Sequence, residues 1–250
     1  MGKNIKKRYS SVINITHAEH IEIVRNIFAT ITRKYDFLNH FLSLGQDAVW
    51  RRFAARQVRF SKTIRFLDIG TGTADLAIAV ARKHPHAKLT GLDFVQEMIR
   101  TGHEKIEKHN MSDQISLLQS DALNLPFPSD SFDAAGIAFG IRNIADRIQA
   151  LKEMKRVLVQ EGQVLVLELN LPRQKLFRGL YHIYLNHMLP HMAHYFSRNP
   201  AAYYYLADSI MHFPQPGEFA LIMEEAGFVH IKKHSLTLGI TYLYEGLKPA

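Results

Sequence analysis

The stretch Arg65-Phe66-Leu67-Asp68-Ile69-Gly70-Thr71-Gly72-Thr73-Ala74-Asp75-Leu76 decides the fold of this chain. Its apolar residues end in the pair Gly70 and Gly72, and an apolar, helix-forming segment follows as far as Arg82. This pattern predicts a strand, a tight turn and a helix, the unit that opens a nucleotide-binding α/β sheet. The glycines let the backbone turn tightly and approach a ligand closely. The helix N-terminus adds free N–H groups and partial positive charge.

Three carboxylates indicate which nucleotide this turn suits. Asp68 precedes the turn, Asp75 stands where a dinucleotide-binding turn has its third glycine, and Asp93 ends a predicted strand over 88–92. A carboxylate at position 75 repels a pyrophosphate but suits a ligand with an ammonium group. An acid at the end of the second strand accepts hydrogen bonds from ribose hydroxyls. These features favour S-adenosylmethionine over NAD, because it has a ribose, no phosphate and an amino-acid end.

A fourth acidic position follows the next predicted strand, over 115–119. Asp121 lies just beyond this strand, on the edge of the sheet where ligands bind. There its carboxylate can accept a hydrogen bond from an adenine amino group, while Ala122 flanks the ring. A lone aspartate in a loop is more often explained by turn formation, so its position in the series carries the prediction.

A polar pair follows a predicted strand over 133–139. Arg142 and Asn143 come after the glycine that ends this strand, which places them at the mouth of the site. A structural alternative for Arg142 is a salt bridge to a nearby acid such as Asp146. Spacing alone leaves both interpretations open.

The composition limits which classes of protein this chain can belong to. The chain has 250 residues, 47% of them hydrophobic, which suits one large α/β domain with a packed core. It has no apolar run long enough for a transmembrane helix, and its basic N-terminus lacks the apolar segment of a secretory signal. The absence of cysteine excludes disulfides and thiolate catalysis and fits a cytoplasmic location.

The net charge of the chain indicates which kinds of binding partner to consider. The net charge of +8 makes nucleic acid and anionic membrane surfaces candidates. No stacking-aromatic RNA motif or zinc-finger spacing is present, so we expect no nucleic-acid partner. We expect a cytoplasmic protein suited to peripheral contact with the inner face of the membrane, and the sequence leaves a homodimer open.

Segments of different composition outline the domain organisation. Residues 1–20 are polar and basic and predict a flexible tail, 21–60 predict an N-terminal helical cap, and 61–250 predict the main α/β domain. Within that domain, 172–216 is rich in tyrosine, histidine and methionine. It predicts a helical insertion after the fifth strand that covers an apolar substrate and is suited to touch a membrane surface.

Three histidines of this insertion raise the alternative of a metal site. His187, His191 and His194 recur at helical spacing, which metal-binding histidines also use. However, Pro190 interrupts that helix and no carboxylate lies near in the sequence. We therefore predict no metal site.

The alternation of strands and helices predicts a Rossmann-like sheet. After a helix over 147–158, Gly162 is expected to turn the chain into a fifth strand over 163–169. Near the C-terminus a strand is expected to begin at Gly227, and the last strand to cover 235–245. An antiparallel hairpin after five alternating units completes a seven-stranded α/β sheet.

With these segments assigned, the sequence from about residue 27 to the C-terminus resembles the ubiquinone/menaquinone biosynthesis C-methyltransferases, a family of class I S-adenosylmethionine-dependent methyltransferases. The most specific stretches are Tyr35-Asp36-Phe37-Leu38-Asn39 with Ser43 and Trp50, Asp121-Ala122-Leu123-Asn124-Leu125-Pro126-Phe127, Phe139-Gly140-Ile141-Arg142-Asn143, Arg156-Val157-Leu158 with Gly162 and Glu168, and Tyr205-Leu206-Ala207-Asp208-Ser209-Ile210. The resemblance implies the seven-stranded methyltransferase sheet.

The resemblance also implies a cofactor and a substrate. The positions that match the family's S-adenosylmethionine contacts are Thr73, Asp93, Asp121, Ala122 and, where the family usually has a serine, Ala138. The substrate would be a polyprenylated quinol, methylated at a ring carbon in menaquinone or ubiquinone biosynthesis. Leu38 and Asp47 replace the usual methionine and histidine in the cap, so a benzoquinol and a naphthoquinol both stay open.

The chemistry assigns roles to three residues. A ring carbon is a poor nucleophile until the neighbouring phenol loses its proton, so the enzyme must align the carbon and stabilise a phenolate. We hypothesise that Arg142 and Asn143 hold the phenolate or an intervening water, and that Tyr35 completes this catalytic network. Arginine remains protonated at ordinary pH, so Arg142 is not a direct base.

Other functions remain open from the sequence. One is methyl transfer to a different hydrophobic aromatic or lipid acceptor. Another is a non-catalytic cofactor-binding scaffold in a quinone-synthesis complex, which Arg142, Asn143 and Tyr35 argue against. A nicotinamide-dependent dehydrogenase is disfavoured by Asp75.

Overall fold

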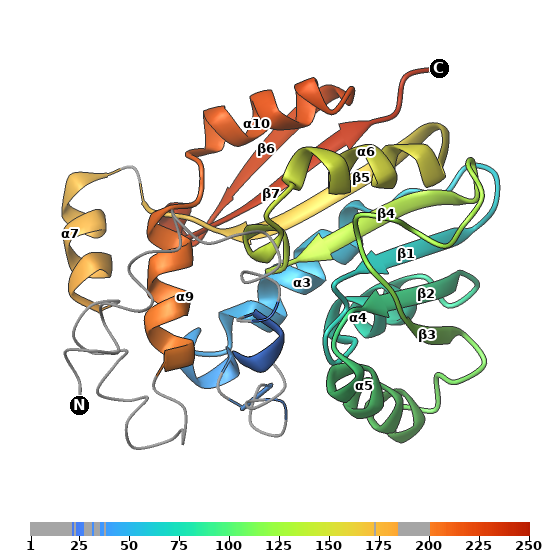
Figure 1. The fold of residues 1–250 in the computed structure, drawn as a ribbon, viewed down its shortest axis with the longest axis horizontal. Coiled ribbons are helices and arrows are strands. Elements are labelled where there is room, and N and C mark those ends of the chain that lie inside the picture. Colours follow the sequence, from blue (N-terminus) through green and yellow to red (C-terminus); the bar gives the residue numbers. More distant parts are fainter. Residues whose placement is uncertain are drawn as a thin grey trace.

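The computed structural model describes residues 22, 24–27, 32, 36–37, 39–172, 174–184 and 201–250, with the backbone alone at 175 and 201–203. Its centre is a seven-stranded sheet in the order β3-β2-β1-β4-β5-β7-β6 (Figure 1). The strands are β1 Arg65–Ile69, β2 Lys88–Asp93, β3 Ile115–Gln119, β4 Phe132–Ala138, β5 Leu158–Leu169, β6 Val229–Leu236 and β7 Thr241–Leu247. This sheet confirms the Rossmann-like α/β fold predicted from the sequence.

The pairing of the strands creates the place where a ligand binds. Strands β1 to β5 pair in parallel, and β7 runs antiparallel between β5 and β6. The chain fills the sheet from β1 outwards to β3 and then crosses to β4 on the other side of β1. In open α/β sheets such a reversal leaves a crevice at the carboxyl ends of the strands.

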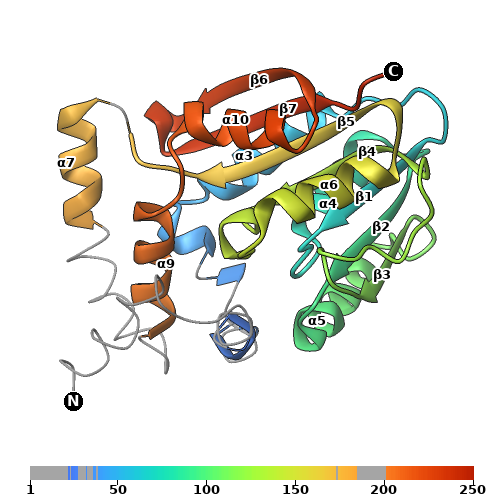
Figure 2. The same ribbon diagram turned by 45° about the horizontal axis from the view of Figure 1, so that its top comes forward.

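Helices cover both faces of the sheet (Figure 2). The helices for which the structure gives bounds are α3 Gln46–Gln57, α4 Asp75–Lys83, α5 Gln96–Lys108, α6 Arg147–Val157, α7 Lys175–Ile183, α9 Ala201–Met211 and α10 Pro216–Glu225, with short 3-10 turns η2 Ile141–Asn143 and η4 Thr237–Gly239. Helices α6 and α10 pack on one face, and α3, α4 and α5 pack on the other.

The alternation of side chains along each strand explains these two layers. Phe66 packs with α3 and α4, whereas its neighbour Leu67 packs with α6 and α10. In β5, Leu165 joins the first layer and Val166 the second. Because successive strand residues point to opposite faces, a continuous apolar run predicts a strand buried on both sides.

Two strand predictions were wrong in their boundaries. Strand β5 begins at Leu158, directly after α6, and Gly162 lies inside it rather than in a turn before it. The left-handed backbone of Glu161 (φ 63°) and a register shift opposite Phe132 form an irregularity that the strand passes through. The last strand was expected over 235–245, but β6 extends to Leu236 and β7 starts only at Thr241. The η4 turn between them contains left-handed residues that no sequence motif predicts.

Helices α7 and α9 lie beyond the carboxyl ends of the parallel strands, together with the described N-terminal residues (Figure 1). Their apolar side chains form a third cluster, which we call the outer cluster: Val24, Ile27, Leu171, Tyr205, Ala207 and Ile210, with Tyr181, Tyr184 and Phe94 packed against it. Among the described helices, none has both the length and the apolar content needed to span a bilayer.

Several expectations concern residues outside the described part of the chain. These are the basic tail over 1–20, Tyr35 and Leu38 of the cap, and the three histidines of the insertion. The catalytic role of Tyr35 therefore stays a prediction.

Candidate functional site

The glycine turn after β1 is joined to the end of β2. Gly70 and Gly72 adopt left-handed backbone conformations (φ 59° and 55°), which residues with a Cβ disfavour. The backbone N–H of Thr71 donates to the Leu92 carbonyl at 2.9 Å, and that of Gly72 donates to the Asp93 carboxylate at 2.9 Å. The turn and the strand end therefore form one rigid wall.

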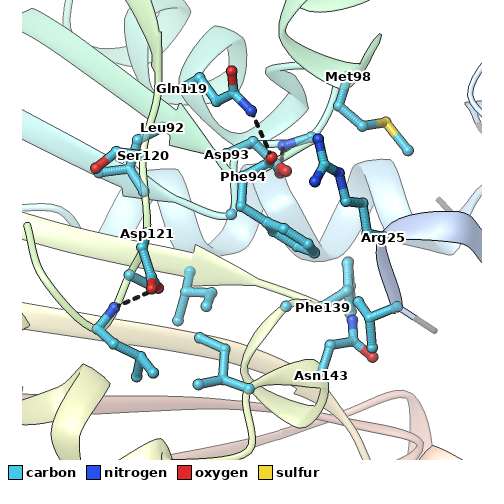
Figure 3. Close-up of a pocket in the computed structure, with 18 of the residues that line it drawn as sticks. Arg25, Leu92, Asp93, Phe94, Met98, Gln119, Ser120, Asp121, Phe139 and Asn143 are labelled. Atoms are coloured by element: carbon cyan, nitrogen blue, oxygen red, sulfur yellow. Dashed lines mark hydrogen bonds between the residues drawn. The ribbon is translucent and has the colours of Figure 1, made fainter. Parts of the chain in front are cut away.

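A cavity of about 320 Å³ opens beside this turn, at the crevice predicted from the strand order (Figure 3). Its volume lies in the range of small-molecule sites. The cavity brings together these residues of the predicted site: Gly70, Gly72, Asp93, Asp121, Ala122, Ala138 and Asn143. Their side chains and backbones come from the ends of four parallel strands, although they are far apart in the sequence.

Asp93 is the buried acid of this cavity, with 7% of its surface exposed. Its carboxylate accepts hydrogen bonds from the backbone N–H groups of Gly72 and Val95, each at 2.9 Å. Burial raises the pKa of Asp93, and these hydrogen bonds oppose the rise. A carboxylate has about four acceptor positions, so it can receive two ligand hydroxyls in addition.

The opposite wall of the cavity is suited to a flat ring. Asp121 stabilises its own loop, because its carboxylate accepts the Leu123 N–H at 2.9 Å (Figure 3). Turn formation and the predicted ligand contact are thus compatible at this residue. Phe94 and Met98 add apolar surface, and Arg25 reaches over the cavity from the N-terminal segment (Figure 3). Arg25 was not predicted, because nothing in its local sequence links it to the sheet.

Asp68 lies beneath the turn, outside the cavity lining. It is fully buried, and one carboxylate oxygen accepts from the Thr71 hydroxyl at 2.7 Å and from the Ala77 N–H at 3.0 Å. Burial raises the pKa of Asp68 to about 7, despite these two hydrogen bonds. Asp68 therefore connects the glycine turn to the first turn of α4.

Thr73 and Asp75 are engaged by the chain itself. The Thr73 hydroxyl donates to the Asp36 carboxylate of the cap at 2.5 Å. The ammonium group of Lys105 bridges the two carboxylates, 2.7 Å from Asp36 and in short contact with Asp75. These contacts join Asp36 of the cap to the glycine turn.

Arg51 continues this network into the cap. The Arg51 guanidinium donates to Asp47 at 2.6 Å and lies 3.8 Å from Asp75. Burial would raise the pKa of Asp47, but hydrogen bonds from His40, Ser43 and Arg51, with the Arg51 charge, hold it below its usual value. Asp47, which stands where the family usually has a histidine, is thus paired with Arg51.

Arg142 forms a buried ion pair with Glu168, and Asp146, the partner suggested by the sequence, instead caps α6. Arg142 Nη1 lies 2.6 Å from both Glu168 Oε1 and the Phe139 carbonyl oxygen. Phe139 lines the cavity with a left-handed backbone (φ 58°), a conformation that persists only when its surroundings enforce it. The ion pair therefore fixes the shape of this wall.

Asn143 lies in the cavity lining and meets a tyrosine from α9. The Tyr205 hydroxyl donates to Asn143 Oδ1 at 3.1 Å. Tyr205 is buried, and burial raises its pKa to about 12. It was absent from the predicted site, although it lies in one of the stretches that carry the family resemblance. The contact spans 62 positions in the sequence, so only the fold reveals it.

The cavity has two chemically different ends. A buried carboxylate with spare acceptor positions and an apolar, ring-sized wall suit a nucleoside that has no phosphate. Val24 and Phe94 belong both to the cavity lining and to the outer cluster, so the cavity adjoins that apolar cluster directly. The arrangement fits S-adenosylmethionine and an apolar acceptor held side by side.

Comparison with known proteins agrees with this geometry. The model of the ubiE/COQ5 methyltransferase family matches residues 15–248. The ubiquinone/menaquinone biosynthesis C-methyltransferase UbiE of Geotalea uraniireducens is 43% identical over 228 residues, which cover 91% of this chain and 97% of that protein. The demethylmenaquinone methyltransferase of Deinococcus radiodurans is 40% identical over 227 residues, covering 91% and 93% of the two chains.

Solved structures support the fold. A SAM-dependent methyltransferase from Aquifex aeolicus superposes with a TM-score of 0.58 at 16% sequence identity, over 79% of this chain and 89% of that chain. At this identity the likeness concerns the fold alone.

Proposed function

Because this chain belongs to the ubiE/COQ5 methyltransferase family, we propose that its cavity holds S-adenosylmethionine beside the ring of a polyprenylated quinol. The protein is an S-adenosylmethionine-dependent C-methyltransferase of menaquinone or ubiquinone biosynthesis. What we propose is which residues bind S-adenosylmethionine and the quinol, and that the quinol carries a polyprenyl tail.

The observation that carries the proposal is that the polar cavity adjoins the apolar outer cluster, with Val24 and Phe94 common to both. Asp93 offers acceptors for ribose hydroxyls, and Asp121 and Ala122 line the wall suited to the adenine. Gly70 and Gly72 leave room for the rest of the cofactor. Thr73, Asp68 and Asp75 act through the turn that they stabilise rather than from the cavity lining.

The acceptor would lie between the cavity mouth and the outer cluster. When bound, S-adenosylmethionine supplies an electrophilic methyl group. Asn143 is positioned to bind the quinol oxygen or a water beside it, and the Tyr205 hydroxyl orients the Asn143 side chain. Arg142 favours the phenolate through its positive charge and holds the Phe139 turn against which the ring would pack. Tyr35 completes this network in our proposal.

The outer cluster supports a long apolar tail on the acceptor. Tyr181 and Tyr184 stack with ring centroids 6.0 Å apart, and burial raises the pKa of both hydroxyls. Neutral, partly buried tyrosines suit an isoprenoid chain better than a polar acceptor. An enzyme that takes its acceptor from the lipid phase would also make peripheral contact with a membrane surface.

The purified protein, S-adenosylmethionine and reduced demethylated naphtho- and benzoquinols test the proposal directly. We expect one added methyl group on a ring carbon of one head group, measured by mass spectrometry of the products. A methylated oxygen, or no product with either quinol, would contradict it. Thermal-shift titrations with S-adenosylmethionine and with NAD then separate an inactive cofactor-binding scaffold from a dehydrogenase, because a true ligand stabilises the folded state.

A further inference from the structure

Helix α7 exposes an apolar stripe. Leu176, Leu180 and Ile183 have 72%, 56% and 55% of their surface exposed. Their spacing of four and then three residues puts them on one side of the helix. Isolated apolar residues on a surface need no explanation, but a stripe along one helix marks a surface that contacts something apolar.

The neighbouring side of α7 already packs on the protein. Tyr181 and Tyr184 lie against the outer cluster, and the Tyr184 hydroxyl donates to the Leu42 carbonyl of the cap at 2.9 Å. Next to that contact the cap exposes Phe41 and Leu44. In both ribbon views α7 lies at the edge of the molecule, beyond α9 from the sheet (Figures 1 and 2). The stripe therefore lies outside the outer cluster, against which the same helix packs.

The part of the sequence that includes the stripe carries charge of one sign. Between Glu168 and Asp208 the sequence has no acidic residue and four basic ones, Arg173, Lys175, Arg178 and Arg198. An apolar helix side within a basic stretch of sequence is typical of segments that lie in the plane of an anionic lipid surface. A protein partner with ordinary surface charges would not require this long acid-free run.

We propose that the stripe of Leu176, Leu180 and Ile183 lies in the headgroup region of an anionic bilayer. The inference rests on the proposed function, because a polyprenylated quinol resides in the bilayer. Docking through α7 places the outer cluster next to the lipid. The prenyl chain then moves from the bilayer to the outer cluster without crossing water.

Vesicle co-sedimentation of the full chain tests the proposal. The probes are vesicles of phosphatidylcholine alone and of phosphatidylcholine with phosphatidylglycerol. The test variant is L176E/I183E, and the matched control is L221E, because Leu221 on α10 is also exposed, at 62%. We expect the wild type and L221E to partition onto the anionic vesicles, and L176E/I183E to partition at least tenfold less.

Methyl transfer to two acceptors separates this proposal from the proposed function. A short-chain quinol in buffer should be methylated equally by all three proteins, whereas a long-chain quinol in anionic vesicles should be methylated at least tenfold more slowly by L176E/I183E. Failure of the wild type with the short-chain quinol refutes the proposed function alone. Unchanged partitioning of L176E/I183E, an equal loss in L221E, or no vesicle binding by the wild type overturns docking through α7. If the double variant fails to fold, the single variant L180Q replaces it, with a smaller loss of partitioning expected.

Discussion

Arg142 Nη1 lies 2.6 Å from Glu168 Oε1, and both side chains are buried. The same nitrogen donates to the carbonyl of Phe139, whose left-handed backbone forms a wall of the cavity. A charge pair that could have served only stability therefore also fixes the geometry of the site.

We expect Arg142→Ala to destabilise the protein by about 3–5 kcal/mol, because it leaves the Glu168 carboxylate buried without its cation. Turnover should fall more than S-adenosylmethionine affinity, since we propose that Arg142 acts on the acceptor. Denaturant unfolding, calorimetric titration and single-turnover rates measure the three effects. Arg52→Ala, at an exposed arginine of α3, is the control. Equal losses of turnover and cofactor affinity would argue against a role at the acceptor.

Asp93→Asn should weaken S-adenosylmethionine binding by about tenfold to a hundredfold, as the loss of charge-assisted hydrogen bonds predicts. The amide has one acceptor oxygen, so it cannot serve the N–H groups of Gly72 and Val95 as the carboxylate does. Calorimetric titration measures the affinity. Glu97→Gln, at an exposed acid in the first turn of α5, should bind normally. Normal affinity in Asp93→Asn would remove Asp93 from the proposed cofactor site.

Asp68→Asn should change how stability depends on pH in the absence of cofactor. The folded-state pKa of Asp68 is raised to about 7, above the unfolded value, so the folded state binds more protons between pH 4 and 7. Asp68 therefore makes the wild type lose stability as pH rises through this window. The asparagine variant lacks this loss, so its Tm relative to wild type should be higher at pH 8 than at pH 5. A Tm difference that is constant with pH would mean that Asp68 ionises normally.

Lys105→Met should loosen the cap from the glycine turn. The change leaves the carboxylates of Asp36 and Asp75 without the cation between them. We expect several-fold weaker S-adenosylmethionine binding, and Lys108→Met, at an exposed lysine of the same helix, should have no effect. In a double-mutant cycle, Asp36→Asn and Lys105→Met should be non-additive by about 0.5–3 kcal/mol. Strict additivity would show that the two side chains act independently.

Local sequence predicted those parts of the site that follow strands. Asp93, Asp121 and Asn143 each come at or after the end of a run recognisable as a strand, and parallel strands bring their carboxyl ends to one edge. The strand boundaries near Gly162 and Leu236 were wrong because they depend on left-handed backbone and a register irregularity. Such features arise from pairing between strands rather than from residue preferences.

The sequence by itself determined the fold, the cofactor turn and the acidic residues at successive strand ends, because glycine placement and apolar periodicity act within a few residues of one another. Only the tertiary structure decided that Arg142 pairs with Glu168, that Thr73 meets Asp36, and that Tyr205 meets Asn143. These partners are 26, 37 and 62 positions apart. Whether two side chains form a contact depends on their distance and burial in the folded chain. Neither quantity can be read from the spacing of residues along the sequence.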